Sequence, residues 1–217
     1  MNFTLKGNTT VISSLRHSGK SELARILILK EKHKFDSIFV ISPTNKCNCF
    51  YDFIDDQKNI IENYSDEWIT QLFSSMEKLN LGKNEKSSDA IHTLLIIDDS
   101  ASGDGFKNSK SLERLFTIGR HFFISTVVIC QRIKSLSTTC RINTIFLIVG
   151  TLNQQSKKIL EDEYTLANIE KSKFQEIYRN AVKNFGFLII NNSAGNAENF
   201  NSYYASIRVS IDKLKVH

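Results

Sequence analysis

The 217 residues include 41% hydrophobic and 24% charged side chains, a balance typical of a globular domain with a sizeable core and unlike that of a disordered or fibrous chain. A formal net charge of +5 permits a polyanionic partner without requiring one. No apolar run approaches the roughly 18 residues that span a bilayer, and residues 1–6 lack the apolar core of a signal peptide. We therefore expect an intracellular protein.

The cysteines agree with that compartment. Their spacing gives neither a disulfide framework nor a paired CxxC metal site, so we expect reduced thiols. They are Cys47, Cys49, Cys130 and Cys140.

The first predicted strand and helix enclose a candidate phosphate-binding loop. Residues 9–13 predict a short strand, and apolar residues on one face predict a helix over residues 20–32. The loop between them ends in Gly19-Lys20-Ser21. Backbone amides converge at such a helix N-terminus, and a lysine with a hydroxyl suits a triphosphate and its magnesium. The positions assigned to nucleotide binding are Ser14, Leu15, Arg16, His17, Ser18, Gly19, Lys20 and Ser21.

Ser14 departs from the usual P-loop spacing, which places a glycine six residues before the lysine. A serine can follow the tight turn if its φ is negative. We therefore expect adapted or weakened nucleotide binding rather than its loss. Because Gly-Lys-Ser alone recurs by chance, the downstream segments must supply the rest of the site.

The next segments alternate between strand and helix. Residues 37–42 predict a second strand that ends at Pro43, and a helix begins at Asp66 with Ser65 as its N-cap. This alternation predicts an α/β fold, with a mostly parallel sheet flanked by helices. Residues 82–89 predict a polar loop.

A buried strand then ends in two carboxylates. The apolar run Leu94 to Ile97 is typical of a strand buried on both faces, and Asp98-Asp99 follows it directly. Taken alone, the pair fits a solvated turn equally well. Behind a P-loop, it is better interpreted as a Walker B element, in which Asp98 holds magnesium through water and Asp99 polarises the attacking water.

A further buried strand brings a polar side chain toward the same place. Residues 110–119 predict a helix and residues 122–130 a strand that ends at Gln131-Arg132. Parallel strands finish at one edge, so Gln131 should emerge beside Lys20 and Asp98. Its amide could sense the γ-phosphate; an ordinary glutamine at a strand end is the alternative.

The remaining segments predict a fifth strand, two helices and an antiparallel ribbon at the sheet edge. We find no internal repeat and no dividing linker, and expect one domain over residues 1–217. The expected ranges are 144–149 for the strand, 154–164 and 171–183 for the helices, and 187–190 and 203–209 for the ribbon.

The order of these parts resembles the FtsK/HerA superfamily of DNA-translocating ATPases. It is most similar to the genome-packaging ATPases of poxvirus-like large DNA viruses, virophages and related elements. The resemblance covers roughly residues 9–150, and Arg120 to Gln131 is its most discriminating part. The segments that carry it are Ser18-Gly19-Lys20-Ser21, Ile41-Ser42-Pro43-Thr44, Asp98-Asp99 and Gly119-Arg120-His121-Phe122-Phe123-Ile124-Ser125, with Arg141 ahead of a further strand.

This resemblance implies a RecA-like P-loop core, in which the strand ending at Gln131 lies between the P-loop strand and the Walker B strand. It also implies ATP and Mg²⁺ as cofactors, and a role for each matching residue. Arg120 and Arg141 are both candidates for an arginine that reaches a neighbour's site, and either could instead form a structural ion pair. The other implied roles are phosphate binding by Lys20, magnesium binding by Ser21 and Asp98, catalysis by Asp99 and γ-phosphate sensing by Gln131.

The implied function is ATP-driven translocation of double-stranded DNA into a preformed capsid. The implied partners are a homo-oligomeric ring of five or six subunits and a capsid or portal component, in the host cytoplasm, a virus factory or the virion. DNA contacts would be to phosphates and sensitive to salt. Possible contributors, each equally well explained as solvated surface, are Lys107, Lys110, Arg132 and Lys134.

Two other function classes stay open. A small-molecule or nucleoside kinase also begins with a P-loop, but it needs an acceptor pocket and a lid that carries an arginine. A nucleotide-gated assembly protein that does not hydrolyse ATP is weakly favoured by Ser14 and disfavoured by Asp98-Asp99.

Overall fold

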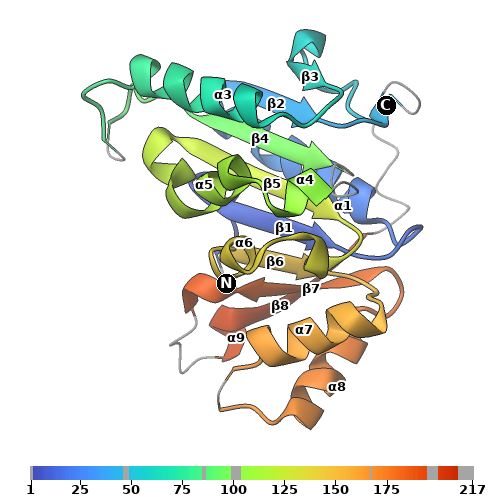
Figure 1. Ribbon diagram of the computed structural model, residues 1–217. Helices are drawn as coiled ribbons and strands as arrows, with labels where there is room; N and C mark the ends of the chain where they lie inside the picture. Colours follow the sequence, from blue (N-terminus) through green and yellow to red (C-terminus); the bar gives the residue numbers. More distant parts are fainter. Residues whose placement is uncertain are drawn as a thin grey trace.

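A mixed sheet of eight strands runs through the part of the chain that the structure describes, in the order β3-β2-β4-β5-β1-β6-β7-β8 (Figure 1). The computed structural model describes residues 2–45, 49–84, 87–98, 104–166, 168–194 and 200–209. The strands are β1 (Thr9–Ser13), β2 (Ser37–Ile41), β3 (Ile60–Ile61), β4 (Thr93–Asp98), β5 (Ile124–Cys130), β6 (Phe146–Val149), β7 (Gly186–Asn191) and β8 (Tyr204–Arg208).

The pairing of these strands confirms the predicted fold class. Neighbours from β3 through β6 pair in parallel, whereas β7 and β8 extend the sheet as an antiparallel ribbon. Strand β5, which ends just before Gln131, lies between β1 and β4, as the resemblance implies. The carboxyl ends of these three strands therefore lie side by side at one edge of the sheet.

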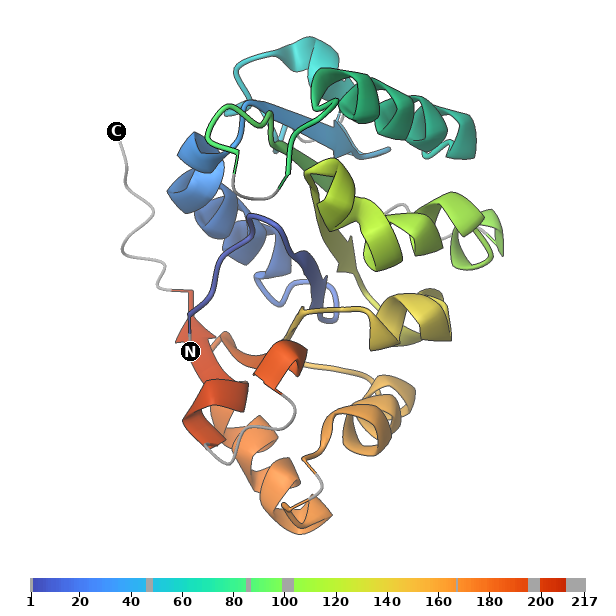
Figure 2. The same cartoon turned by 90° about the vertical axis from the view of Figure 1, so that its left-hand side faces the viewer.

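Helices cover both faces of the sheet. Figure 2 shows α1 on one side of the strands and α3, α5 and α6 on the other. The helices are α1 (Lys20–Glu31), α3 (Asp66–Leu79), α4 (Asp104–Lys107), α5 (Lys110–Ile118), α6 (Thr138–Ile142), α7 (Gln154–Tyr164), α8 (Lys171–Ala181) and α9 (Phe200–Tyr203). Short 3-10 turns are η1 (Lys32–Lys34), η2 (Gln57–Asn59), η3 (Gly119–Phe122), η4 (Ile133–Ser135) and η5 (Asn192–Ala194).

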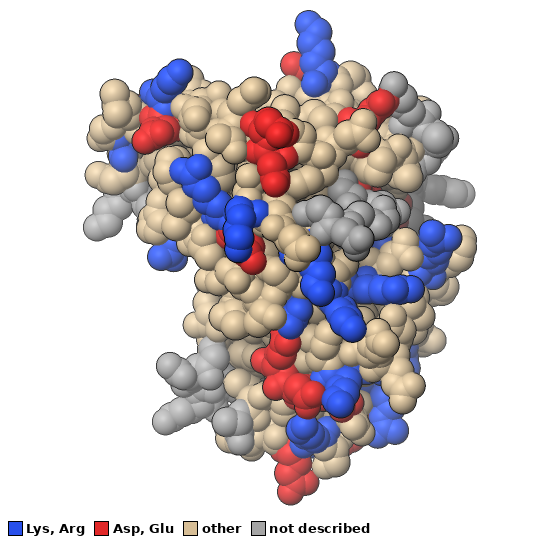
Figure 3. All heavy atoms as spheres, in the orientation of Figure 1, with Lys and Arg blue, Asp and Glu red and all other residues tan. Residues whose placement is uncertain are grey.

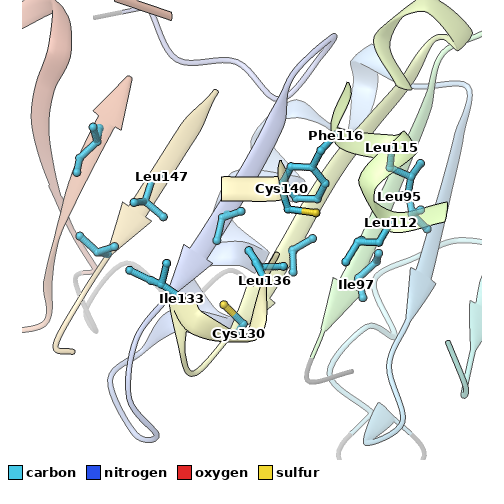
Figure 4. Packing of buried hydrophobic residues seen from close by; sticks show 14 of the residues in the cluster. Leu95, Ile97, Leu112, Leu115, Phe116, Cys130, Ile133, Leu136, Cys140 and Leu147 are labelled. Carbon is cyan, nitrogen blue, oxygen red and sulfur yellow. The ribbon is translucent and has the colours of Figure 1, made fainter. Parts of the chain in front are cut away.

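Two apolar clusters hold these layers together, one on each face. Along β4, Leu95 and Ile97 belong to the cluster beneath α3 and α5, while Leu94 and Ile96 belong to the cluster beneath α1. This alternation follows from the period of two in a strand. Figure 4 shows side chains of α5 gathered over β4 in the first cluster, with Cys130 and Cys140 nearby. A central strand buried on both faces is rigid, which suits it to hold a functional side chain at its end.

Several predicted boundaries are wrong by one or two residues, and for two strands the local reason is clear. Strand β5 starts at Ile124 rather than residue 122, because η3 and the left-handed Phe123 (φ 58°) precede it. Strand β6 starts at Phe146 rather than Thr144, because Thr144 still caps α6. Its hydroxyl donates to the Cys140 carbonyl and its amide to the Arg141 carbonyl.

The helix over residues 66–79 begins as predicted, with the Ser65 hydroxyl accepting from the Trp68 amide. The short strand β3 is not predicted by the sequence. Among the cysteines, Cys49, Cys130 and Cys140 are free thiols, and Cys47 lies outside the described residues. No helix within the described ranges is both long and apolar enough to cross a membrane.

Candidate nucleotide-binding site

The loop between β1 and α1 has the backbone conformation of a phosphate-binding loop. All five residues of β1 are buried, and α1 begins at Lys20 directly after the loop. Gly19 is left-handed (φ 82°), which glycine adopts readily, and His17 is left-handed too (φ 58°). For a residue with a Cβ this conformation costs about 1 kcal/mol or more, so the surrounding structure must hold it. Such alternation of backbone conformation turns successive amides toward one concavity that favours an anion.

The loop is hydrogen-bonded to the segment that follows β6, at the position where a glycine is usual. Ser14 is fully buried and does not have a positive φ. Its hydroxyl donates to the Thr151 carbonyl at 3.1 Å, and the Leu15 amide donates to the same carbonyl at 2.8 Å. A Cβ on Gly150 would lie 2.5 Å from the Ser14 Oγ. The space for the serine is therefore provided by a glycine at the end of β6.

Replacing Gly150 with alanine is expected to destabilise the folded protein, because it disturbs the packing beneath the P-loop. The added Cβ would meet Ser14 Oγ at 2.5 Å and Phe187 Cε1 at 2.8 Å, both in the buried interior. Overpacking of this kind costs about 1–3 kcal/mol in the free energy of unfolding, measurable by urea or thermal denaturation. Gly119→Ala is the matched control, since its nearest neighbour, the Ile124 carbonyl oxygen, lies at 3.4 Å. A Gly150→Ala variant as stable as the wild type would contradict the packing account.

The strand register brings the candidate magnesium ligand to the P-loop edge. Asp98 pairs with Ile129 of β5, and Cys130 of β5 pairs with Ser13 of β1. Lys20 and Asp98 are both buried, with 7% and 6% of their surface exposed. The Asp98 carboxylate and the Ser21 hydroxyl are hard oxygen donors of the kind that Mg²⁺ prefers beside substrate phosphates. The residues present therefore fit a magnesium nucleotide.

Tyr51 contacts the candidate magnesium ligand and is missed by sequence reasoning. Its hydroxyl donates to Asp98 Oδ2 at 2.8 Å, and the side chain is fully buried. Its amide donates to the Asn45 side chain, which fixes the segment. A neutral donor orients the carboxylate without neutralising its charge. The aromatic cluster Phe50, Tyr51 and Phe53 was the available signal for a buried segment, but it did not indicate which carboxylate Tyr51 would meet.

The other predicted site residues fall in different places. Gln131 is half-buried at the end of β5, between the ends of β1 and β4. Arg120 is exposed in η3, before β5 begins, and so lies at the opposite edge of the sheet from the P-loop. Asp99 lies outside the described residues.

Arg141 forms a bidentate ion pair. Its Nε and Nη2 each donate to the Glu163 carboxylate at 2.8 Å, and Nη1 donates to the Leu136 carbonyl. The hydrogen bonds to Glu163 raise the pKa of the guanidinium above its usual value. With only 11% of its side chain exposed, Arg141 is engaged by a residue of its own chain.

The chain matches a viral protein family over most of its length. The family model described as Poxvirus A32 protein matches residues 9–213. Uncharacterized protein 015R of Frog virus 3 (isolate Goorha) is 24% identical over 195 residues, which cover 87% of this chain and 58% of the relative. Uncharacterized protein 075L of Invertebrate iridescent virus 6 is 28% identical over 158 residues, covering 72% and 60%. The chain thus spans less than two thirds of the length of these curated relatives.

Solved structures share the fold. The genome packaging NTPase B204 from Sulfolobus turreted icosahedral virus 2, in complex with AMP, matches with a TM-score of 0.66 and 14% identity, covering 96% of this chain and 100% of that chain. EssC (ATPases 2 and 3) from Geobacillus thermodenitrificans matches with a TM-score of 0.57 and 13% identity, covering 86% and 38%. These similarities show that the chain shares the fold of these ATPase structures.

Proposed function

This chain belongs to the poxvirus A32 protein family, and we propose that it is an ATP-hydrolysing motor that translocates double-stranded viral DNA into preformed capsids. The observation that supports this function best is the position of β5 between β1 and β4. It sets Gln131 between the P-loop and Asp98, the arrangement expected for a translocating ATPase of the FtsK/HerA type. A nucleoside kinase has no use for that arrangement.

The proposed chemistry assigns each side chain at this edge a task in phosphoryl transfer. Lys20 binds the β- and γ-phosphates, and Ser21 and Asp98 hold the magnesium ion. The ion, when bound, neutralises charge on the phosphate oxygens. Asp99 orients and polarises the attacking water, and Gln131 senses the γ-phosphate. Tyr51 keeps the Asp98 carboxylate in place for the metal.

The proposed assembly is a homo-oligomeric ring of five or six subunits, working with a capsid or portal component inside the infected cell. Arg120 is the better candidate for the arginine that completes a neighbour's site. It is exposed at the edge away from its own P-loop, whereas Arg141 is engaged by Glu163. An exposed arginine at one edge and an open nucleotide site at the other suit head-to-tail contact between subunits.

The proposed DNA contacts come from exposed basic side chains near the nucleotide edge. Figure 3 shows Lys and Arg side chains gathered on the face between α4 and α7. Lys107, Arg132 and Lys134 are exposed, and Arg132 and Lys134 follow β5 directly. Lys110 is also exposed but pairs with Glu113 at 3.1 Å, so it contributes less charge. Contacts to phosphates alone would be independent of DNA sequence.

ATP turnover in the presence and absence of long double-stranded DNA tests this function. We expect DNA to raise turnover, and we expect the stimulation to fall steeply between about 50 and 200 mM salt because counterions are released from phosphate contacts. If DNA of any length leaves turnover unchanged while a nucleoside acceptor raises it, the kinase alternative replaces the motor. Tight ATP binding without any hydrolysis, with or without DNA, would instead favour the assembly protein.

A further inference from the structure

An open pocket lies beside the P-loop, on the side away from Asp98. Its volume is about 380 Å³. One wall is the P-loop itself, from Leu15 to Ser18, and the other is the turn between α8 and β7, where Phe185 lies. In Figure 1 this turn and the β1–α1 loop project on the same side of the molecule. The pocket is therefore continuous with the proposed phosphate site.

The order of the strands fixes which end of a nucleotide would point into this pocket. Asp98 ends β4 and Gln131 follows β5, and both strands lie to one side of β1. The pocket lies over the ends of β6 and β7, on the other side of β1. A triphosphate whose γ-phosphate faces Asp98 and Gln131 must run across the P-loop amides and leave on the β6 side. The nucleoside would then lie next to this pocket.

Phe185 has an unusual position for a large apolar residue. It is 55% exposed, although apolar side chains of this size are normally buried. Its backbone is left-handed (φ 57°), and so is that of Asn184 before it (φ 53°). For a residue with a Cβ this conformation persists only where the surrounding structure enforces it. Leu15, 37% exposed, adds a second apolar surface to the same pocket.

The helix before this turn, α8, is hydrogen-bonded to the segment after β6, which also accepts hydrogen bonds from Ser14 and Leu15 of the P-loop through the Thr151 carbonyl. Tyr178 of α8 donates to the Gly150 carbonyl at 2.9 Å and accepts from the Leu152 amide at 3.0 Å. Burial raises the pKa of Tyr178 to about 12, so the hydroxyl keeps its proton at neutral pH. Gly186 closes the turn against the end of α8, where a Cβ would overlap the Ala181 carbonyl oxygen. The aromatic ring is thus displayed from a rigid support.

We propose that the purine base of ATP occupies this pocket and stacks on the ring of Phe185. The inference rests on the proposed ATP-binding function and adds a base-binding site to it. Stacking suits this pocket because an aromatic ring can bind the face of any purine. Such a contact needs only one face of the base, so the pocket can remain partly open to water. The strained, exposed Phe185 and the adjoining hollow are then two parts of one binding surface.

Competition binding with a fluorescent ATP analogue tests the base site, using ATP and inorganic tripolyphosphate as competitors. For the wild type, we expect ATP to compete more strongly than tripolyphosphate, which lacks a base. In Phe185→Ala we expect ATP to bind about tenfold more weakly, the loss typical of one stacked base, with competition by tripolyphosphate unchanged. Phe185→Trp should restore ATP binding. Leu81→Ala, at an exposed apolar residue outside the pocket, is the matched control.

The outcomes separate this proposal from the function on which it rests. If ATP and tripolyphosphate both bind and Phe185→Ala leaves both unchanged, the base site is wrong while the P-loop function stands. If Phe185→Ala weakens both competitors equally, the residue acts only on the structure of the P-loop, and the base site is also wrong. If neither competitor binds the wild type, both proposals fall. Thermal melting of each variant shows whether the fold is retained.

Discussion

Replacing Lys20 with alanine is expected to lower ATP turnover by at least about 100-fold, the usual loss when one preorganised positive donor to the reacting group is removed. Lys20 is the first residue of α1 and is buried beside the loop amides, so water cannot replace its ammonium group at the phosphates. Turnover of the purified variant at saturating ATP, with DNA present, measures the effect.

The control for this experiment is Lys30→Ala. Lys30 lies in the last turn of the same helix and is exposed, so its loss removes one positive charge without touching the site. The Lys20→Ala variant should melt no lower than the wild type, because a buried charge is removed rather than created. If the folded Lys20→Ala variant keeps turnover within about tenfold of the wild type, Lys20 does not bind the reacting phosphates and the proposed role of the P-loop is wrong.

Replacing Arg120 with alanine is expected to lower DNA-stimulated turnover by about 10³-fold or more, the loss typical of an arginine that a neighbouring subunit supplies, as the proposed ring requires. The expectation depends on place: Arg120 is exposed and lies before β5, whereas the P-loop lies past the other end of the sheet. It lies too far along the sheet to serve its own site, and in the proposed ring it would face an adjacent one. Steady-state turnover at ring-forming concentrations is the measurement.

Mixing two inactive variants tests whether Arg120 acts between subunits. A Lys20→Ala subunit still carries Arg120, and an Arg120→Ala subunit still carries an intact P-loop, so a mixture should regain part of the turnover. Arg141→Ala is the comparison: it should lower the melting temperature by breaking the pair with Glu163 and spare the turnover of molecules that remain folded. If Arg141→Ala stays folded but inactive, while Arg120→Ala is fully active, the two assignments must be exchanged.

The strands and the nucleotide edge can be predicted from the sequence because their signals are local. Four apolar residues before Asp98, the Gly19-Lys20-Ser21 loop before a helical period, and Ser65 as an N-cap each indicate structure within a few residues. Parallel strands then bring the polar residues at their ends together without any knowledge of side-chain contacts.

The contacts that refine the site could not be predicted, because each joins residues far apart in the sequence. Tyr51 meets Asp98 across 47 residues, and Ser14 meets Thr151 across 137. Arg120 and Arg141 are indistinguishable as isolated arginines until the fold places Glu163 beside one of them. The left-handed Phe185 carries no sequence signal at all, since glycine or asparagine is the residue expected there.

The packing of Ser14 against Gly150 also changes what counts as a complete P-loop. The glycine that leaves room for the turn does not have to lie within the eight residues of the loop. In this protein Gly150, directly after β6, provides the space. A sequence motif that requires glycine at the first position considers only the loop after β1. It does not consider the residue after β6 that packs against that position. The motif requires free volume between two adjacent chain segments. A glycine in either segment can provide that volume, because it has no side chain.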